Sequence, residues 1–176
     1  PDEEQMGRLA AQALLEGHHR DIGVIELDPN DGEAAPGRRV GCEAYLEQAG
    51  IPWSTVRVAV GHGTTRGGYA AAARLLTDHP WLTGLVCGND RMAMGAYDAI
   101  REQGLRVRDD VAVIGIDDQE LIADQLHPAL TTVALPFEEM GQVAASHLLA
   151  LMEGEEVPAE TLLPGQIIRR SSAWHP

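Results

Sequence analysis

The sequence contains no lysine, so all 13 of its basic residues are arginine. This absence excludes Schiff-base chemistry, a phosphate-binding loop lysine and the lysine of a phospho-acceptor receiver site. Aromatic residues make up only 4% of the chain, so Leu, Val, Ile and Ala must build the core. Hydrophobic residues reach 44% of 176, which is enough for one compact α/β domain or a large lobe of a two-lobed one.

Positive charge is also scarce: 27 acidic residues outnumber the 13 basic ones, for a formal net charge of -14 at pH 7. Duplex DNA requires Lys or Arg contacts to its phosphates, so we expect that this chain does not hold DNA by itself. No apolar run reaches the roughly 18 residues of a membrane span, and no secretory signal precedes the first predicted helix. A cytoplasmic protein without a membrane partner is therefore predicted.

Only two cysteines are present, Cys42 and Cys87, and they lie far apart without metal-ligand spacing. Each stands in an apolar context, so we interpret both as reduced, buried thiols. The sequence predicts neither a metal site nor a cofactor. It begins at Pro1 rather than at Met, directly before a helical pattern, which indicates a fragment of a longer protein.

Short runs rich in Val and Ile alternate with amphipathic helical stretches along the first two thirds of the chain. This regular alternation predicts βαβ units and an α/β fold with a doubly wound parallel sheet and flanking helices. After Pro128 we expect an extended segment over 130–135, a long helix over 138–152 and a final strand pair over 162–169, broken at Pro164-Gly165. The earlier strands are predicted at 22–27, 55–60, 82–87 and 111–116. Four helices are predicted before and between them: the first two end near residues 17 and 50, and the next two cover 68–77 and 90–103.

Polar side chains follow each of the four predicted parallel strands. Ligands of open α/β sheets bind beyond the carboxyl ends of the strands, so these side chains should meet at one edge. A guanidinium, a carboxamide and a carboxylate around one cleft suit a polyhydroxylated ligand. In strand order, the groups are Arg38 and Arg39; His62, Thr64 and Thr65; Asn89 and Asp90; Asp117 and Asp118.

Each of these groups also has a structural interpretation. Asp90 is a good helix N-cap, and Asn89 and the Asp117-Asp118 pair are typical of turns. Arg38 fits a solvated helix position, and His62 fits an ordinary loop histidine. Paired carboxylates at a strand end also bind Mg²⁺ in phosphoryl enzymes. The missing lysine and the absence of a Gly-x-Ser-x-Gly elbow argue against an enzyme.

Several ordered motifs carry a resemblance to a known family. They are Gly88-Asn89-Asp90-Arg91-Met92-Ala93-Met94-Gly95-Ala96, the stretch from Gly104 to Asp118, Pro128-Ala129-Leu130-Thr131-Thr132-Val133, and Met140-Gly141. Along essentially its whole length the chain resembles the LacI/GalR transcription regulators. The resemblance implies a periplasmic-binding-protein-like type I core, whose two lobes enclose a small-molecule effector, and a homodimer. It also implies an N-terminal helix-turn-helix, absent from this sequence, that binds operator DNA.

The resemblance divides the chain into three parts. Residues 1–135 correspond to the C-terminal lobe, 136–158 to a helix that belongs to the N-terminal lobe, and 159–176 to the return into the C-terminal lobe; most of the N-terminal lobe is missing. Three effector contacts carry over by position, Arg38, Asn89 and Asp117, and we add His62 from its place at a strand end. Where many members carry an aromatic residue, this chain has Gly63 and Ile116.

The predicted effector is a sugar or related polyol, and the missing aromatics leave a smaller polyol or a nucleoside-like molecule open. The alternative function is a periplasmic sugar-binding protein of a transport system.

A further expectation concerns the long helix near the C-terminus. Its apolar face, which includes Met140, Val143, Ala144 and Leu148, should be exposed and should dock on another chain or fold back on its own lobe.

Overall fold

The computed structural model describes residues 1–30 and 32–173, and within them six strands form one sheet in the order β2-β1-β3-β4-β5-β6. Strands β1 to β5 pair in parallel, and β6 pairs antiparallel with β5 at one edge. The central strand β3 is buried along its whole length, and β4 is buried from Ala112 to Ile116. The strands are β1 (Ile22–Glu26), β2 (Arg57–Val60), β3 (Gly84–Cys87), β4 (Ala112–Asp117), β5 (Thr131–Ala134) and β6 (Gln166–Ile168).

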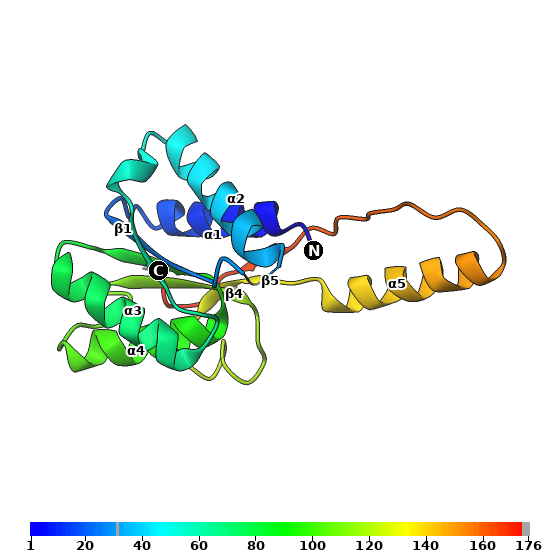
Figure 1. The fold of residues 1–176 in the computed structure, drawn as a ribbon. Helices are drawn as coiled ribbons and strands as arrows, with labels where there is room; N and C mark the ends of the chain where they lie inside the picture. The colour runs from blue at the N-terminus through cyan, green and yellow to red at the C-terminus, as the bar shows by residue number, and fades with distance from the viewer. Residues whose placement is uncertain (31, 174–176) are drawn as a thin grey trace.

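Helices cover both faces of this sheet (Figure 1). Helices α1 and α2 pack together on one face, and α3 and α4 pack together on the other. The arrangement confirms the predicted α/β fold with a doubly wound sheet and flanking helices. The four helices are α1 (Glu3–Glu16), α2 (Ala34–Gln48), α3 (Thr65–Asp78) and α4 (Asp90–Glu102).

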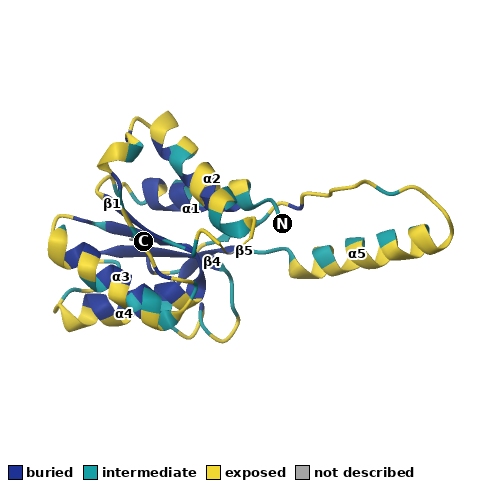
Figure 2. Cartoon of the chain, viewed as in Figure 1, coloured by how far each residue is buried: buried dark blue, intermediate teal, exposed yellow. Residues whose placement is uncertain are grey.

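The apolar core consists of one layer on each face of the sheet (Figure 2). Leu14 of α1 belongs to the first layer, and Leu85 of β3 belongs to the second. On α4, Ala93, Ala96 and Ile100 are fully buried in that second layer. Each buried Leu or Ile contributes roughly 1.5–3 kcal/mol of transfer free energy, so these layers hold the sheet and helices together.

Two glycines allow α1 and α2 to touch backbone to backbone. A Cβ added at Gly7 of α1 would lie 1.8 Å from the carbonyl oxygen of Arg38. A Cβ added at Gly41 of α2 would lie 1.7 Å from the carbonyl oxygen of Glu4. No side chain fits at either position, and the contact brings the first turn of α1 beside Arg38.

The structure differs from the sequence prediction in three places. A 3₁₀ turn over Trp53–Thr55 delays β2 to Arg57. Helix α3 begins earlier than predicted because the Thr64 hydroxyl accepts a hydrogen bond from the Gly67 backbone N–H and caps it. The predicted final strand pair over 162–169 is wrong, since only β6 forms there. Pro164 has no backbone N–H with which to extend a ladder.

Helix α5 (Phe137–Met152) projects away from the sheet at the end of β5 (Figure 1). None of its residues, all of which the structure describes, is buried (Figure 2). Leu148, on the face predicted to be apolar, is 60% exposed, and Leu149 and Met152 are exposed as well. The helix does not fold back on the sheet, and its docking on another chain stays a prediction.

Both cysteine side chains are free and buried, as predicted. Burial raises the pKa of the Cys42 thiol to about 12 and raises the pKa of Cys87 as well, so both stay protonated at neutral pH. Within residues 1–30 and 32–173, no helix is both long enough and apolar enough to cross a membrane.

Candidate functional site

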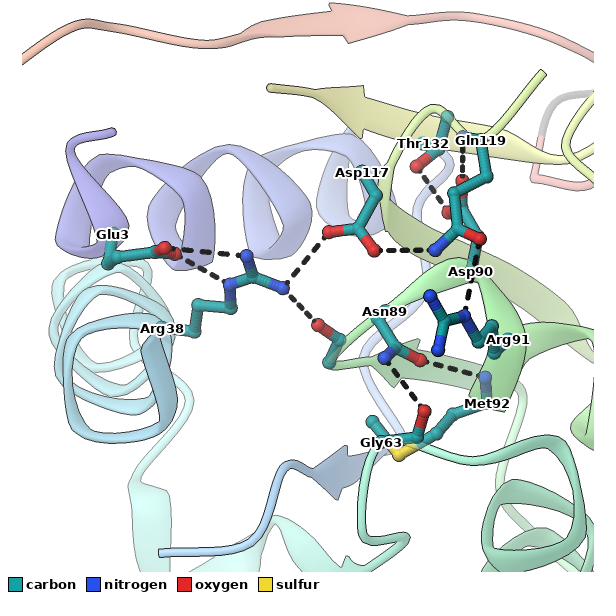
Figure 3. Close-up of polar contacts among 11 residues, drawn as sticks. Glu3, Arg38, Gly63, Asn89, Asp90, Arg91, Met92, Asp117, Gln119 and Thr132 are labelled. Carbon is teal, nitrogen blue, oxygen red and sulfur yellow. Dashed lines mark hydrogen bonds and ion pairs between the residues drawn. The ribbon is translucent and has the colours of Figure 1, made fainter. Parts of the chain in front are cut away.

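The direction of chain winding reverses between β1 and β3. From β1 the chain passes to β2 on one side, and it then returns to place β3 on the other side of β1. In doubly wound sheets, the crevice beyond the strand ends at this point is the usual ligand site. Arg38, Asn89 and Asp117 come from three different elements, α2, the β3–α4 junction and β4, and their side chains lie near one another at this edge of the sheet (Figure 3).

Arg38 is the central residue of the site, and its side chain is only 10% exposed. Its Nη1 donates to the carbonyl oxygen of Gly88, at the end of β3, and lies 3.4 Å from Asp117 Oδ1. On its other side, Nε donates to Glu3 Oε2 at 2.7 Å, and Nη2 reaches Glu3 Oε1 at 3.5 Å. The interpretation of Arg38 as a solvated helix residue is therefore wrong.

Asp117 ends β4 in an unusual backbone conformation. Its φ is 126°, and the φ of the following Asp118 is 57°, a region that L-residues seldom adopt. Such backbone conformations cluster at functional sites. Asp117 Oδ2 accepts a hydrogen bond from Gln119 Nε2 at 2.8 Å. Burial raises the pKa of Asp117, and the contacts with Gln119 and Arg38 act in the opposite direction.

Asn89, rather than Asp90, is the N-cap of α4, so the prediction that Asp90 caps this helix is wrong. Asn89 Oδ1 accepts from the backbone N–H of Met92 at 2.9 Å, and its Nδ2 donates to the carbonyl oxygen of Gly63 at 3.1 Å (Figure 3). One amide N–H and one oxygen lone pair remain for a ligand. The cap therefore fixes the orientation of Asn89 while leaving it able to bind.

Asp90 is fully buried behind the site. Its Oδ1 accepts from Thr132 Oγ1 at 2.6 Å, and its Oδ2 accepts from the backbone N–H of Gln119 at 2.7 Å. At Gly115 a Cβ would lie 2.1 Å from Asp90 Oδ1, so the carboxyl group fills the space of a side chain. Burial raises the pKa of Asp90 to about 7, although both hydrogen bonds lower it. Asp90 thus joins β5 to the Gln119 loop that holds Asp117.

His62 lies at the rim, with its side chain 64% exposed. Its Nδ1 is 2.8 Å from Asp28 Oδ2, which follows β1, and its own φ is 52°. Asp28 also accepts from Asn30, and these hydrogen bonds lower the pKa of Asp28. The structure thus places His62 beside the loop after β1, outside the group formed by Arg38 and Asp117.

The other strand-end residues have structural partners. Arg39 pairs with Glu26 and Glu43 and stacks over Trp53, so it braces the outer face of α2. Thr64 caps α3, and Thr65 is the first residue of that helix.

The two adjacent carboxylates of Asp117 and Asp118 point to different partners. Asp117 faces Arg38, whereas Asp118 Oδ1 lies 2.7 Å from Arg170 Nη2. Two carboxylates turned apart in this way do not form a shared magnesium site. In the part of the chain that the structure describes, no three His, Cys, Asp or Glu side chains are grouped so that they could hold a metal ion.

Three residues of the site escaped the sequence analysis: Glu3, Gln119 and Thr132. Glu3 is 35 residues from Arg38 in sequence, and only the helix contact brings them together. The signal that could have found it is the spacing of Gly37 and Gly41, which lets another helix approach one face of α2. Gln119 directly follows one family motif and Thr132 lies within another, but no local pattern joins either of them to Asp90.

The periplasmic binding protein-like domain family matches residues 2–173. In sequence, the chain is 38% identical over 174 residues to the HTH-type transcriptional repressor PurR of Yersinia pestis, which covers 97% of this chain and 50% of that protein. The chain thus spans about half the length of the curated relatives it matches.

Solved structures give the same result. A LacI family transcriptional regulator from Enterococcus faecium with bound ribose has a TM-score of 0.88 and 30% identity, over 98% of this chain and 63% of that one. A lac repressor dimer bound to operator and the anti-inducer ONPF has a TM-score of 0.89 and 30% identity, over 98% of this chain and 51% of that one. These relatives are transcription regulators, which favours that reading over the transport alternative. The chain belongs to the periplasmic binding protein-like domain family and corresponds to the effector-binding region of LacI/GalR-type regulators.

Proposed function

We propose that this chain senses a sugar or sugar-like small molecule and controls the operator affinity of a DNA-binding regulator. The ligand lies beyond the carboxyl ends of β1 to β4 and contacts Arg38, Asn89 and Asp117, with His62 at the rim. The observation that carries the proposal is the Arg38 guanidinium, which lies between Asp117 and the end of β3 at the reversal point of the sheet. Buried donors and acceptors side by side suit the hydroxyl groups of a polyol.

The rest of the regulator is part of the same proposal. Residues 1–135 and 159–176 form one lobe, and the helix over 136–158 belongs to a second lobe that completes the cleft. Operator DNA is bound by an N-terminal helix-turn-helix domain, and the protein acts in the cytoplasm as a homodimer. The region catalyses no reaction, because Asp117 and Asp118 are held by different arginines and are not aimed at a common reacting atom.

The response follows from a shift between two lobe arrangements. An effector that binds one arrangement more tightly raises its population, and the ratio of the two affinities sets the size of the change in operator binding. Strand β5 leads directly into α5, so only a short connection joins the sheet region that carries Asp117 to helix α5 (Figure 1). Movement of one relative to the other is therefore available to the chain.

The binding site is tested by calorimetry with neutral pentoses and hexoses, beginning with ribose. Arg38→Gln and Asp117→Asn should each weaken the binding of a sugar by about tenfold or more, since each removes a charge-assisted hydrogen bond. Arg39→Gln and Asp118→Asn are matched controls, because they remove the same charges one residue away. A sugar panel without a single binder, or controls as damaging as the site variants, would contradict the proposed site.

The regulatory step needs a second experiment on the full-length protein. Operator affinity is measured with and without a sugar that binds the chain. We expect a change in operator affinity that disappears in Asp117→Asn, and an unchanged affinity would refute regulation while leaving sugar binding intact.

A further inference from the structure

Glu3 occupies one side of the arginine on which ligand binding is proposed to depend. An arginine side chain has five N–H donors. Here Nε and one Nη2 hydrogen face the Glu3 carboxylate, and Nη1 serves both the Gly88 carbonyl oxygen and Asp117. One N–H of Arg38 is left for a ligand. A carboxylate or phosphate therefore meets no open guanidinium fork unless Glu3 moves away.

The packing of α1 against α2 holds Glu3 in this position. A Cβ added at Gly37 would lie 2.6 Å from the Cβ of Glu3, so α2 meets α1 directly at this residue. The close contact at Gly41 fixes the next turn of the pair. The Glu3 side chain is only 15% exposed, which strengthens its attraction to Arg38 relative to a surface pair. Glu3 is thus a built part of the site and not a surface residue that happens to reach it.

The charges around the crevice favour ligands without negative charge. Glu3 and Asp117 place two carboxylates against the single guanidinium of Arg38. Neighbouring charges are already paired: Arg39 with Glu26, and Arg170 with Asp118. The side chain of Arg91, on the first turn of α4, is exposed, and its Nε lies 3.4 Å from Gln119 Oε1 (Figure 3).

We propose that Glu3 sets the charge selectivity of this site, so that it accepts neutral polyols or amino sugars and rejects sugar acids and sugar phosphates. This inference rests on the proposed function and names the class of effector for it. The neutral hydroxyls of a sugar can accept the remaining Arg38 N–H and donate to Glu3 or Asp117. An anionic group would instead be placed close to two carboxylates, which disfavours binding.

The test compares ribose with ribose 5-phosphate, and glucose with glucose 6-phosphate, by calorimetry on the full-length protein that contains this chain. Wild type should bind the neutral member of a pair more tightly. Glu3→Gln should shift the preference toward the phosphate by about tenfold, since it frees the guanidinium fork and removes a buried charge. Glu4→Gln is the matched control, because it removes the same charge from the same helical turn at an exposed residue. Its preference should stay within about twofold of wild type.

Each other outcome overturns a defined claim. Equal shifts in both variants, or no shift in Glu3→Gln, would sink the role of Glu3 while sugar binding stands. If wild type binds the phosphate and the neutral sugar with equal affinity, the role of Glu3 in charge selectivity is also refuted. This result does not depend on whether Glu3→Gln folds, which circular dichroism reports. If no probe binds wild type or Glu3→Gln, the sugar-sensing proposal fails and this inference falls with it.

Discussion

The sheet with its four flanking helices and the α5 helix use similar residues with opposite results. In the sheet region, Leu, Ile, Val and Ala pack into two continuous core layers. Helix α5 carries Leu148, Leu149 and Met152, and each of them is exposed. An apolar pattern therefore predicts that a helix forms, but the partner it packs against depends on segments far away in sequence. The following substitutions test how different the two regions are.

The largest contrast is expected for two Leu→Ala substitutions. Leu85→Ala, in the fully buried centre of β3, should lower the free energy of unfolding by about 3–5 kcal/mol, because it removes packed methyl groups and leaves a cavity. Leu148→Ala on α5 should change it by less than about 0.5 kcal/mol. Urea titration followed by circular dichroism measures both. Equal losses would show that α5 is packed in solution.

The buried carboxyl of Asp90 gives the sheet region a pH dependence. Its folded pKa of about 7 lies above the ordinary aspartate pKa of 3.8, so the folded state binds the proton more tightly than the unfolded state. This contribution to stability is present below pH 4 and is lost as the pH rises from about 4 to 7. Asp90→Asn should flatten the profile of unfolding free energy against pH by about 2–4 kcal/mol over that range.

Glu139→Gln is the control for this profile, since it removes a carboxylate from exposed α5. It should leave the dependence on pH as in wild type. An Asp90→Asn profile as steep as that of wild type would mean that another group is responsible.

Two Gly→Ala substitutions should have opposite signs. At Gly41 the new Cβ would overlap a backbone oxygen of α1, and we expect a loss of about 2 kcal/mol. At Gly141 of α5 nothing lies within 4 Å, so alanine should stabilise the helix by about 0.5–1 kcal/mol. Thermal melts followed by circular dichroism at 222 nm measure both. A destabilising Gly141→Ala would reveal a neighbour on that face.

The smallest effect on folding is expected for Leu149→Ser on α5. This exposed substitution should alter the unfolding free energy by less than about 0.5 kcal/mol. It should nevertheless reduce any self-association of the chain, because exposed apolar faces favour docking. Sedimentation velocity over a range of concentrations tests this, and identical association in both proteins would argue against docking through α5.

Much of the fold was predictable from local patterns. The four strands over 22–27, 55–60, 82–87 and 111–116 are all present, and the sheet winds as predicted. The apolar periodicity and the short spacing of elements suffice for this. The last strand pair failed because short segments near proline carry little periodic signal.

The candidate site was predictable in part. Strand ends place Arg38 and Asp117 together because parallel strands share one carboxyl edge. Glu3 was not predictable in this way, since its place depends on the contact of two helices through Gly7 and Gly41. The cap of α4 was misplaced by one residue, because Asp90 turns inward toward Thr132, and this is a tertiary contact.

The consecutive positive φ values at Asp117 and Asp118 affect how these two aspartates can be substituted in evolution. The kink sends one carboxylate to the pocket and the neighbouring one to the tail of the chain at Arg170. The two adjacent aspartates therefore have independent roles. A lineage could replace the second aspartate together with its tail arginine and keep ligand recognition intact, whereas drift at the first would alter what the pocket accepts.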